Sequence, residues 1–201
     1  VSGLFDTTRI ALSDTLIENT DRDEVMAVMA HEMGHYVLNH IWEMFAMFTL
    51  LLAIGFAVTN GLFGWANRVL GQRWGIADIG DVAGLPLLIA CLSVFFFAAT
   101  PVFNTIIRTN EAEADIFGLN AAREPDGFAT TALRLSSYRK IEPGPLEEGF
   151  MFDHPSGRAR VFMAMQWKAG QLEMGAADQT PDLRIDRAEA IAAELEAANA
   201  E

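Results

Sequence analysis

The chain has 201 residues, of which 51% are hydrophobic, and its 27 acidic and 14 basic residues leave a net charge of −13. The sequence has no basic stripe and no aromatic platform with interleaved arginines, so nucleic acid is excluded as an expected partner. The lone cysteine, Cys91, rules out an intrachain disulfide and is expected to serve in packing.

The first predicted element is a small β-hairpin or edge strand within residues 2–18, where apolar side chains alternate with polar ones and turn formers occur near Asp6 and Asp14. An exposed edge strand of this kind can hold an extended peptide by backbone hydrogen bonds. The chain begins at Val1 rather than at a methionine, so we expect further sequence upstream.

A helix is predicted next. Asp21 and Glu24 have the spacing of a capping box, and no proline interrupts the apolar residues that follow. Gly34 departs from this pattern, because a glycine inside a helix costs about 1 kcal/mol relative to alanine, and it therefore favours close approach of another backbone. We expect the helix to continue through His40 and Ile41 into the apolar segment beyond.

Residues 31–35 of this helix are HEMGH, a match to the pattern HExxH. His31 and His35 are four residues apart and share a helix face, so both imidazoles can bind one metal ion. Zinc suits such ligands, and a catalytic zinc site with three protein ligands leaves one position for water. Glu32 is then the expected base, which takes a proton from the water as it attacks a peptide carbonyl.

A chance match to HExxH and the role of a further histidine, His40, also have to be considered. HExxH also arises by chance, so the motif alone does not establish a metal site. His40 lies five residues beyond His35, about 140° around a regular helix, and is therefore expected to be an interfacial or structural residue rather than a ligand.

Two long segments without charged residues follow, at residues 44–67 and 82–107. Each exceeds the roughly 20 residues that a helix needs to cross a hydrocarbon core of about 30 Å, so both are predicted to be transmembrane helices. Pro86 and Pro101 lie inside the second segment, where neighbouring helices can satisfy the freed carbonyls. The alternative is a pair of buried core helices in a soluble protein.

The third metal ligand is expected after the second span, in the string EAEAD of residues 111–115. Glu111 and Asp115 share a helix face, whereas Glu113 points roughly the opposite way. Glu111 can bind zinc while Asp115 accepts the distal N–H of a zinc histidine, and Arg108 is near enough to balance the charge of Glu111. The alternative is a solvated acidic helix start.

His154 follows a loop at residues 141–148 and precedes Pro155, which favours a non-helical residue at 154 and a helix just beyond. A histidine placed there can donate to the oxyanion of a tetrahedral intermediate, and the alternative is an ordinary surface histidine. Residues 171–201 are rich in acids and alanines, which is typical of a solvated helix or a frayed tail.

These motifs, taken in order, resemble the type I CAAX prenyl protease family of integral-membrane zinc metallopeptidases, which is related to the heat-shock-induced membrane protease of bacteria. The resemblance extends from about residue 4 to about residue 167. It rests on residues 8–16, residues 24–30, HEMGH with His40, Arg108 with EAEAD, and the set His154, Pro155, Ser156 and Arg158.

The resemblance implies roles for individual residues. It implies that His31, His35 and Glu111 bind one Zn²⁺ ion per chain and that Glu32 is the general base. It also implies that His154 lies near the substrate carbonyl. It further implies that Asp115 supports a zinc histidine and that Arg108 helps to shape the site.

The expected protein is thus an all-α integral membrane endopeptidase, with a zincin-like HExxH helix that continues into a transmembrane helix. Residues 1–170 would form the catalytic domain and residues 171–201 the tail. Its partners would be the lipid bilayer and a peptide or protein substrate, membrane-associated or prenylated, as in CAAX processing or membrane-protein quality control. The arginines after the second span favour a catalytic site near the cytoplasmic face, in the inner membrane of a bacterium or the endoplasmic reticulum of a eukaryote. The competing hypothesis is a non-catalytic membrane protein with a structural zinc site.

Overall fold

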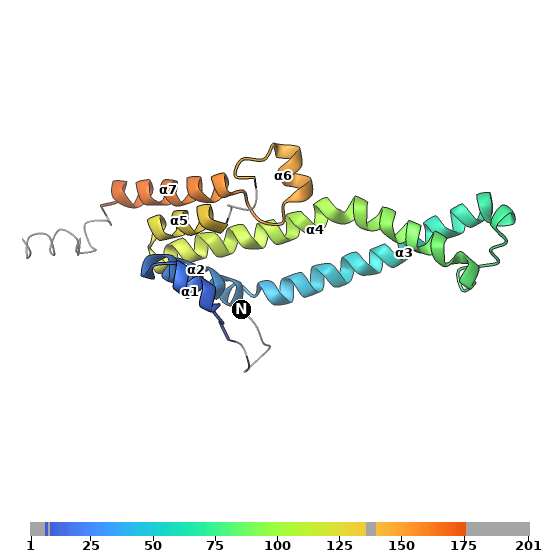
Figure 1. The fold of residues 1–201 in the computed structure, drawn as a ribbon, viewed down its shortest axis with the longest axis horizontal. Helices are drawn as coiled ribbons and strands as arrows, with labels where there is room; N and C mark the ends of the chain where they lie inside the picture. Colours follow the sequence, from blue (N-terminus) through green and yellow to red (C-terminus); the bar gives the residue numbers. More distant parts are fainter. Residues whose placement is uncertain (1–6, 8, 136–139, 176–201) are drawn as a thin grey trace, which may run out of the picture.

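A computed structural model describes residues 7, 9–135 and 140–175, and its regular elements are helices (Figure 1). The prediction of an all-α fold is therefore confirmed for the described residues. In chain order the elements are α1 (Asp14–Asn19), α2 (Arg22–Val37), α3 (His40–Trp74), the 3₁₀ turn η2 (Val82–Gly84), α4 (Leu85–Ala122), α5 (Pro125–Leu135), α6 (Pro145–Met151) and α7 (Gly157–Glu173).

The expected N-terminal hairpin is wrong where the structure can test it, because residues 14–19 form α1. The side chain of Ser13 accepts a hydrogen bond from the backbone N–H of Leu16 at 3.2 Å, which is the contact that begins a helix rather than a strand. Arg9 forms an isolated bridge, and residues 2–6 and 8 of the predicted hairpin lie outside the described residues.

The start of α2 confirms the predicted capping box. The Asp21 side chain accepts hydrogen bonds from the N–H groups of Asp23 and Glu24, and the Glu24 carboxylate accepts one from the N–H of Asp21 at 2.9 Å. The end of α2 corrects a prediction, because the metal-motif helix does not continue into the span. It ends at Val37, and Asn39 adopts a left-handed backbone with φ of 62° before α3 begins. Asparagine visits this conformation more readily than other non-glycine residues, so a break is possible without glycine or proline.

Helices α3 and α4 form an antiparallel hairpin that projects from the other helices (Figure 1). With 35 and 38 residues, they are roughly 52 and 57 Å long at 1.5 Å per residue. Both are long and apolar enough to cross a membrane, and only 6% and 22% of their most apolar stretches are buried. The alternative of two core helices in a soluble protein requires the opposite, since core helices are covered.

Pro86 lies in the first turn of α4, where proline is well tolerated, and Pro101 is inside the helix. Beyond the apolar segment α4 continues without a break to Ala122, and there it packs against α2. Around this end of α4 the helices α2, α5 and α7 enclose a small core, which consists of Ala27, Leu119, Phe128, Ala129 and Ala164.

Candidate metal centre

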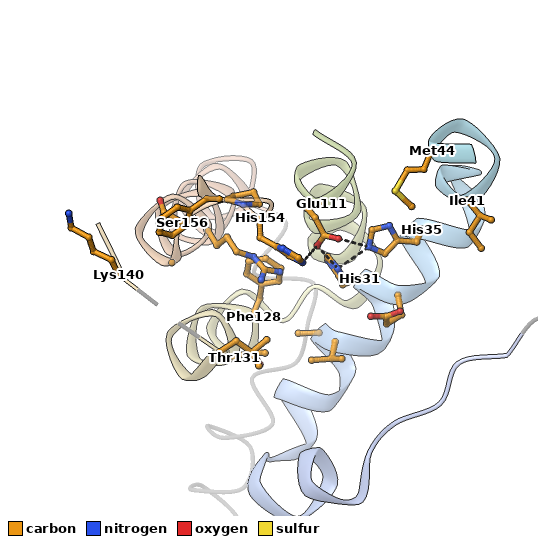
Figure 2. Close-up of a pocket in the computed structure, with 18 residues that line it drawn as sticks. His31, His35, Ile41, Met44, Glu111, Phe128, Thr131, Lys140, His154 and Ser156 are labelled. Carbon is orange, nitrogen blue, oxygen red and sulfur yellow. Dashed lines mark hydrogen bonds and ion pairs between the residues drawn. The ribbon is translucent and has the colours of Figure 1, made fainter. Parts of the chain in front are cut away.

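The HEMGH motif on α2 faces the EAEAD string on α4, and three side chains converge between the two helices (Figure 2). The Nε2 atoms of His31 and His35 are 3.2 Å apart. The Glu111 carboxylate lies 3.3 Å from His31 Nε2 through Oε2 and 3.4 Å from His35 Nε2 through Oε1. No other group of three or more His, Cys, Asp or Glu side chains in the described residues is arranged to hold a metal ion.

This donor set fits zinc by both chemistry and spacing. Zinc takes imidazole nitrogen and carboxylate oxygen at about 2.0–2.2 Å, and donors at that distance from a tetrahedral centre lie about 3.3–3.6 Å from one another. The distance of 3.2 Å between the two histidine nitrogens lies just below that range, and the distances of 3.3 and 3.4 Å from these nitrogens to the two Glu111 oxygens fall at its short end. Three protein donors leave one tetrahedral position, as in the catalytic class of zinc site rather than the structural class with four.

Small residues allow the two helices to approach closely enough for these contacts. A Cβ atom added to Gly34 would lie 3.0 Å from the Cα of Ala114, and one added to Gly118 would lie 3.0 Å from the backbone nitrogen of His31. The prediction that another backbone approaches Gly34 is therefore confirmed, and the reciprocal contact at Gly118 adds a second point of close approach.

Asp115 and Arg160 lie on the Nδ1 side of the His31 ring, away from the Nε2 atom that faces the other donors. Asp115 is fully buried, and its Oδ1 lies 2.7 Å from His31 Nδ1. Arg160 on α7 donates from Nε to the other carboxylate oxygen at 2.8 Å, so the buried charge of Asp115 is paired. Burial lowers the pKa of His31, but hydrogen bonds and charge interactions with Asp115 and Glu111 outweigh it and raise the pKa to about 9. In the metal-free protein His31 is therefore a cation at neutral pH.

Glu32 and His154 line the same cleft as the three donor residues. His154 lies in the connection between α6 and α7, with Nε2 at 3.4 Å from Glu111 Oε2 and Nδ1 at 3.0 Å from Asp153 Oδ1. Figure 2 shows the His154 ring approaching Glu111 from the side opposite α2. The structure thus gathers all five residues that the sequence singled out for the metal, the base and the oxyanion.

Arg108 differs from its expected place. Its guanidinium donates to the backbone carbonyl oxygens of Phe152 at 2.7 Å and Glu148 at 3.1 Å, and among the described residues it forms no ion pair with Glu111. The structure therefore shows contacts of Arg108 with backbone carbonyls, and a charge balance between Arg108 and Glu111 stays a prediction. Because Phe152 ends α6 two residues before His154, Arg108 acts on the backbone that carries that histidine.

Three residues near the site were not assigned a place in it from the sequence: Arg160, Phe128 and Thr131. Arg160 lies 5.1 Å above the Phe128 ring, and both line the cleft with Thr131. A signal for Arg160 was present, because Arg160, Ala164 and Trp167 follow the four- and seven-residue spacing of a buried helix face. Arg158, which the family resemblance singled out, pairs instead with Glu142 and is exposed.

The cleft has a volume of about 430 Å³ and is lined by residues of α2, α4, α5, α7, the start of α3 and the connection between α6 and α7. This size is within the range of small-ligand and peptide side-chain sites. Beside the polar site residues its wall has an apolar part, which consists of Ala27, Val28, Ile41, Met44, Phe128, Leu135 and Phe152.

Comparison with known proteins places this site in a family. The chain is 32% identical over 163 residues to the uncharacterized metalloprotease YhfN of Bacillus subtilis, which covers 80% of this chain and 38% of that protein. It is 26% identical over 176 residues to CAAX prenyl protease 1 of Saccharomyces cerevisiae, covering 78% of this chain and 38% of the yeast protein. The chain thus spans less than two fifths of the length of these relatives.

The crystal structure of Ste24p from S. mikatae matches with a TM-score of 0.55 at 21% identity, covering 74% of this chain and 37% of Ste24p, which is a likeness of fold. Residues 1–168 match the family model of peptidase family M48. A match over this much of the sequence identifies the chain as a member of peptidase family M48.

Proposed function

We propose that the chain is the catalytic part of a zinc-dependent membrane endopeptidase. The observation that carries the proposal is the convergence of the His31, His35 and Glu111 donors at tetrahedral spacing beside an open cleft that Glu32 also lines. His31, His35 and Glu111 would hold the ion, which when bound supplies a Lewis acid that polarises the peptide carbonyl and acidifies water.

The chain's own residues then move the protons. Glu32 takes a proton from the water whose oxygen forms the new bond to the carbonyl carbon. The same carboxyl returns that proton to the departing amine nitrogen as the C–N bond breaks, so the products are a carboxyl and an amine terminus. His154, on the other side of Glu111, donates a hydrogen bond to the carbonyl oxygen as negative charge develops there.

The position of the cleft supports a substrate that the membrane delivers. Ile41 and Met44 lie in the first turns of α3, the first membrane-capable helix, and both line the cleft. A prenylated C-terminal peptide and an unfolded membrane protein both meet this requirement, and the name of one relative, CAAX prenyl protease 1, agrees with the first. We propose the prenylated or otherwise membrane-associated class as substrate, with residues 1–170 as the catalytic domain.

We also propose that the site faces the cytoplasm, because Arg108, Arg123 and Arg134 follow the second span.

A direct experiment is to purify the full-length protein in detergent and measure zinc per chain. Cleavage of a prenylated CAAX peptide and of an unfolded membrane protein is then assayed. We expect one zinc per chain and cleavage that Glu32→Gln abolishes while zinc is retained. Glu43→Gln, a neighbouring exposed acid in the first turn of α3, is the control and keeps wild-type activity. Activity that survives Glu32→Gln contradicts the assigned base, and a fully zinc-loaded wild type that cleaves neither substrate favours a structural zinc site.

A further inference from the structure

His40 and Glu113 form a line of contacts behind the second metal-binding histidine. His40 is fully buried, and its Nδ1 lies 3.0 Å from Nδ1 of His35. On its other side, His40 Nε2 lies 3.3 Å from Oε2 of Glu113, whose side chain is about half exposed. Neither residue faces the cleft, so the proposed chemistry leaves this line of contacts without a role.

The break between α2 and α3 is what brings His40 to this position. On a continuous helix His40 would lie about 140° around the axis from His35. The left-handed backbone of Asn39 instead turns α3, so that the rings of His35 and His40 meet edge to face with centroids 5.1 Å apart. Asn39 thus has a backbone conformation that is uncommon for a non-glycine residue, and it has it next to the point where the His35 and His40 rings lie at hydrogen-bond distance.

The proton positions along this line follow from the number of donors and acceptors. A neutral imidazole has one N–H donor and one bare nitrogen acceptor. If His35 presents a bare Nε2 to the metal centre, its proton is on Nδ1 and is donated to Nδ1 of His40. His40 then carries its proton on Nε2 and donates it to the Glu113 carboxylate. If the His40 ring donated from Nδ1 instead, His35 would carry its proton on Nε2, the atom required for the metal.

We infer that His40, oriented by Glu113, is a positioning residue that holds His35 in the tautomer able to bind the metal. The inference rests on the proposed function. It makes the two metal-binding histidines alike, since each has a buried partner on its distal nitrogen: Asp115 for His31 and His40 for His35. Such partners orient a ligand and strengthen it, and their loss typically weakens metal binding about 10- to 100-fold.

The test measures zinc affinity by competition with a chromogenic chelator, using the full-length protein in detergent. We expect His40→Ala to raise the zinc dissociation constant about 10- to 100-fold. His40→Asn should recover most of that loss, because the amide oxygen can accept from His35 Nδ1 where the ring nitrogen did. Glu113→Gln should bind nearly as tightly as the wild type, since an amide oxygen also accepts, and Glu113→Ala should be intermediate. Glu43→Gln is the matched control on the same turn as His40.

A second measurement reads the tautomer without any metal. Nitrogen-15 spectra of the histidine rings in the metal-free protein, recorded at a pH where His35 is neutral, should show its proton on Nδ1 in the wild type. In His40→Ala this preference should be lost. The thermal unfolding of each metal-free variant separates a folding defect from a positioning effect. If His40→Ala does not fold, the zinc dissociation constants of His40→Asn and Glu113→Ala decide. Near wild-type affinity in His40→Asn together with weakened affinity in Glu113→Ala supports the role of His40, and wild-type affinity in Glu113→Ala contradicts it.

Failure of this inference can be distinguished from failure of the proposed function. A folded His40→Ala that binds zinc as tightly as the wild type and keeps the Nδ1 proton overturns the role of His40 alone, provided that Glu111→Ala loses zinc. A wild type that binds no zinc overturns both.

Discussion

Gly118→Ala tests whether the close contact between α2 and α4 sets the spacing of the metal donors. The new Cβ would lie 3.0 Å from the backbone nitrogen of His31 and 3.2 Å from its Cα, whereas ordinary contacts begin near 3.4 Å. Because both neighbours are backbone atoms, the helices must separate by the difference between 3.4 and 3.0 Å, about 0.4 Å. Metal–donor distances tolerate only about 0.2 Å, so the shift exceeds what a zinc site accepts.

Two opposing terms set the stability of the variant. Overpacking costs about 1–3 kcal/mol, and the better helix propensity of alanine returns about 1 kcal/mol. The metal-free variant should therefore be destabilised by about 0–2 kcal/mol, whereas its zinc affinity should fall at least about tenfold, or about 1.4 kcal/mol. Chemical unfolding of the metal-free protein and chelator competition for zinc measure the two quantities separately.

Gly170→Ala is the matched control, because Gly170 is inside α7 and its added Cβ meets nothing within 4 Å. It should gain about 1 kcal/mol from propensity alone and leave zinc binding unchanged. A Gly118→Ala protein that is stabilised like the control and binds zinc with wild-type affinity would refute the idea that helix spacing controls the metal centre.

The remaining predictions concern the charges around the site. Glu111→Ala should lose stoichiometric zinc, as metal analysis of the purified variant would reveal; retention of one zinc per chain would remove Glu111 from the ligand set. Arg160→Ala should lower the free energy of unfolding by about 1–3 kcal/mol, because it removes the charged hydrogen bonds of Arg160 to the fully buried Asp115 and leaves His31 as the cationic partner of that carboxylate. A loss below about 1 kcal/mol in denaturant titration would contradict that. The pKa of His31 in the metal-free protein is raised from 6.5 to about 9, so its contribution to stability is fully present below pH 6.5 and is lost as the pH rises through about 9. Unfolding of the metal-free protein as a function of pH should show this loss, and His31→Gln should remove it. Chelation of the metal at neutral pH should lower the melting temperature, because zinc binds the folded state alone.

Sequence reasoning succeeded where a feature depends on residues close together in the chain. The capping box at Asp21, the two apolar helices, and the helix spacing that pairs His31 with His35 and Glu111 with Asp115 are all of this kind. Gly34 was informative for another reason, since a glycine inside a helix can mark the close approach of another backbone, and here Ala114 of α4 makes that approach.

Features decided by contacts between distant elements were not predictable in this way. The break at Asn39 occurs in an apolar run without glycine or proline, so the local pattern favoured a continuous helix. Arg108 and Arg160 are 52 residues apart, and which of them pairs with the EAEAD string depends on how α6 and α7 return over α4. A single sequence does not show how α6 and α7 fold back over α4.

The continuity of α4 has a mechanical consequence. The apolar turns around Phe97 and the carboxylate of Glu111 belong to one helix, in which Pro101 removes one backbone hydrogen bond, whereas the histidines of α2 are separated from α3 by the turn at Asn39. A residue inserted into α4 between these two points would rotate Glu111 by about 100° and advance it by about 1.5 Å, whereas one inserted beside Asn39 could be absorbed by the turn. The two halves of the metal centre are therefore connected differently to the apolar hairpin: Glu111 is on the same helix as the apolar turns, whereas His31 and His35 are joined to α3 through a turn.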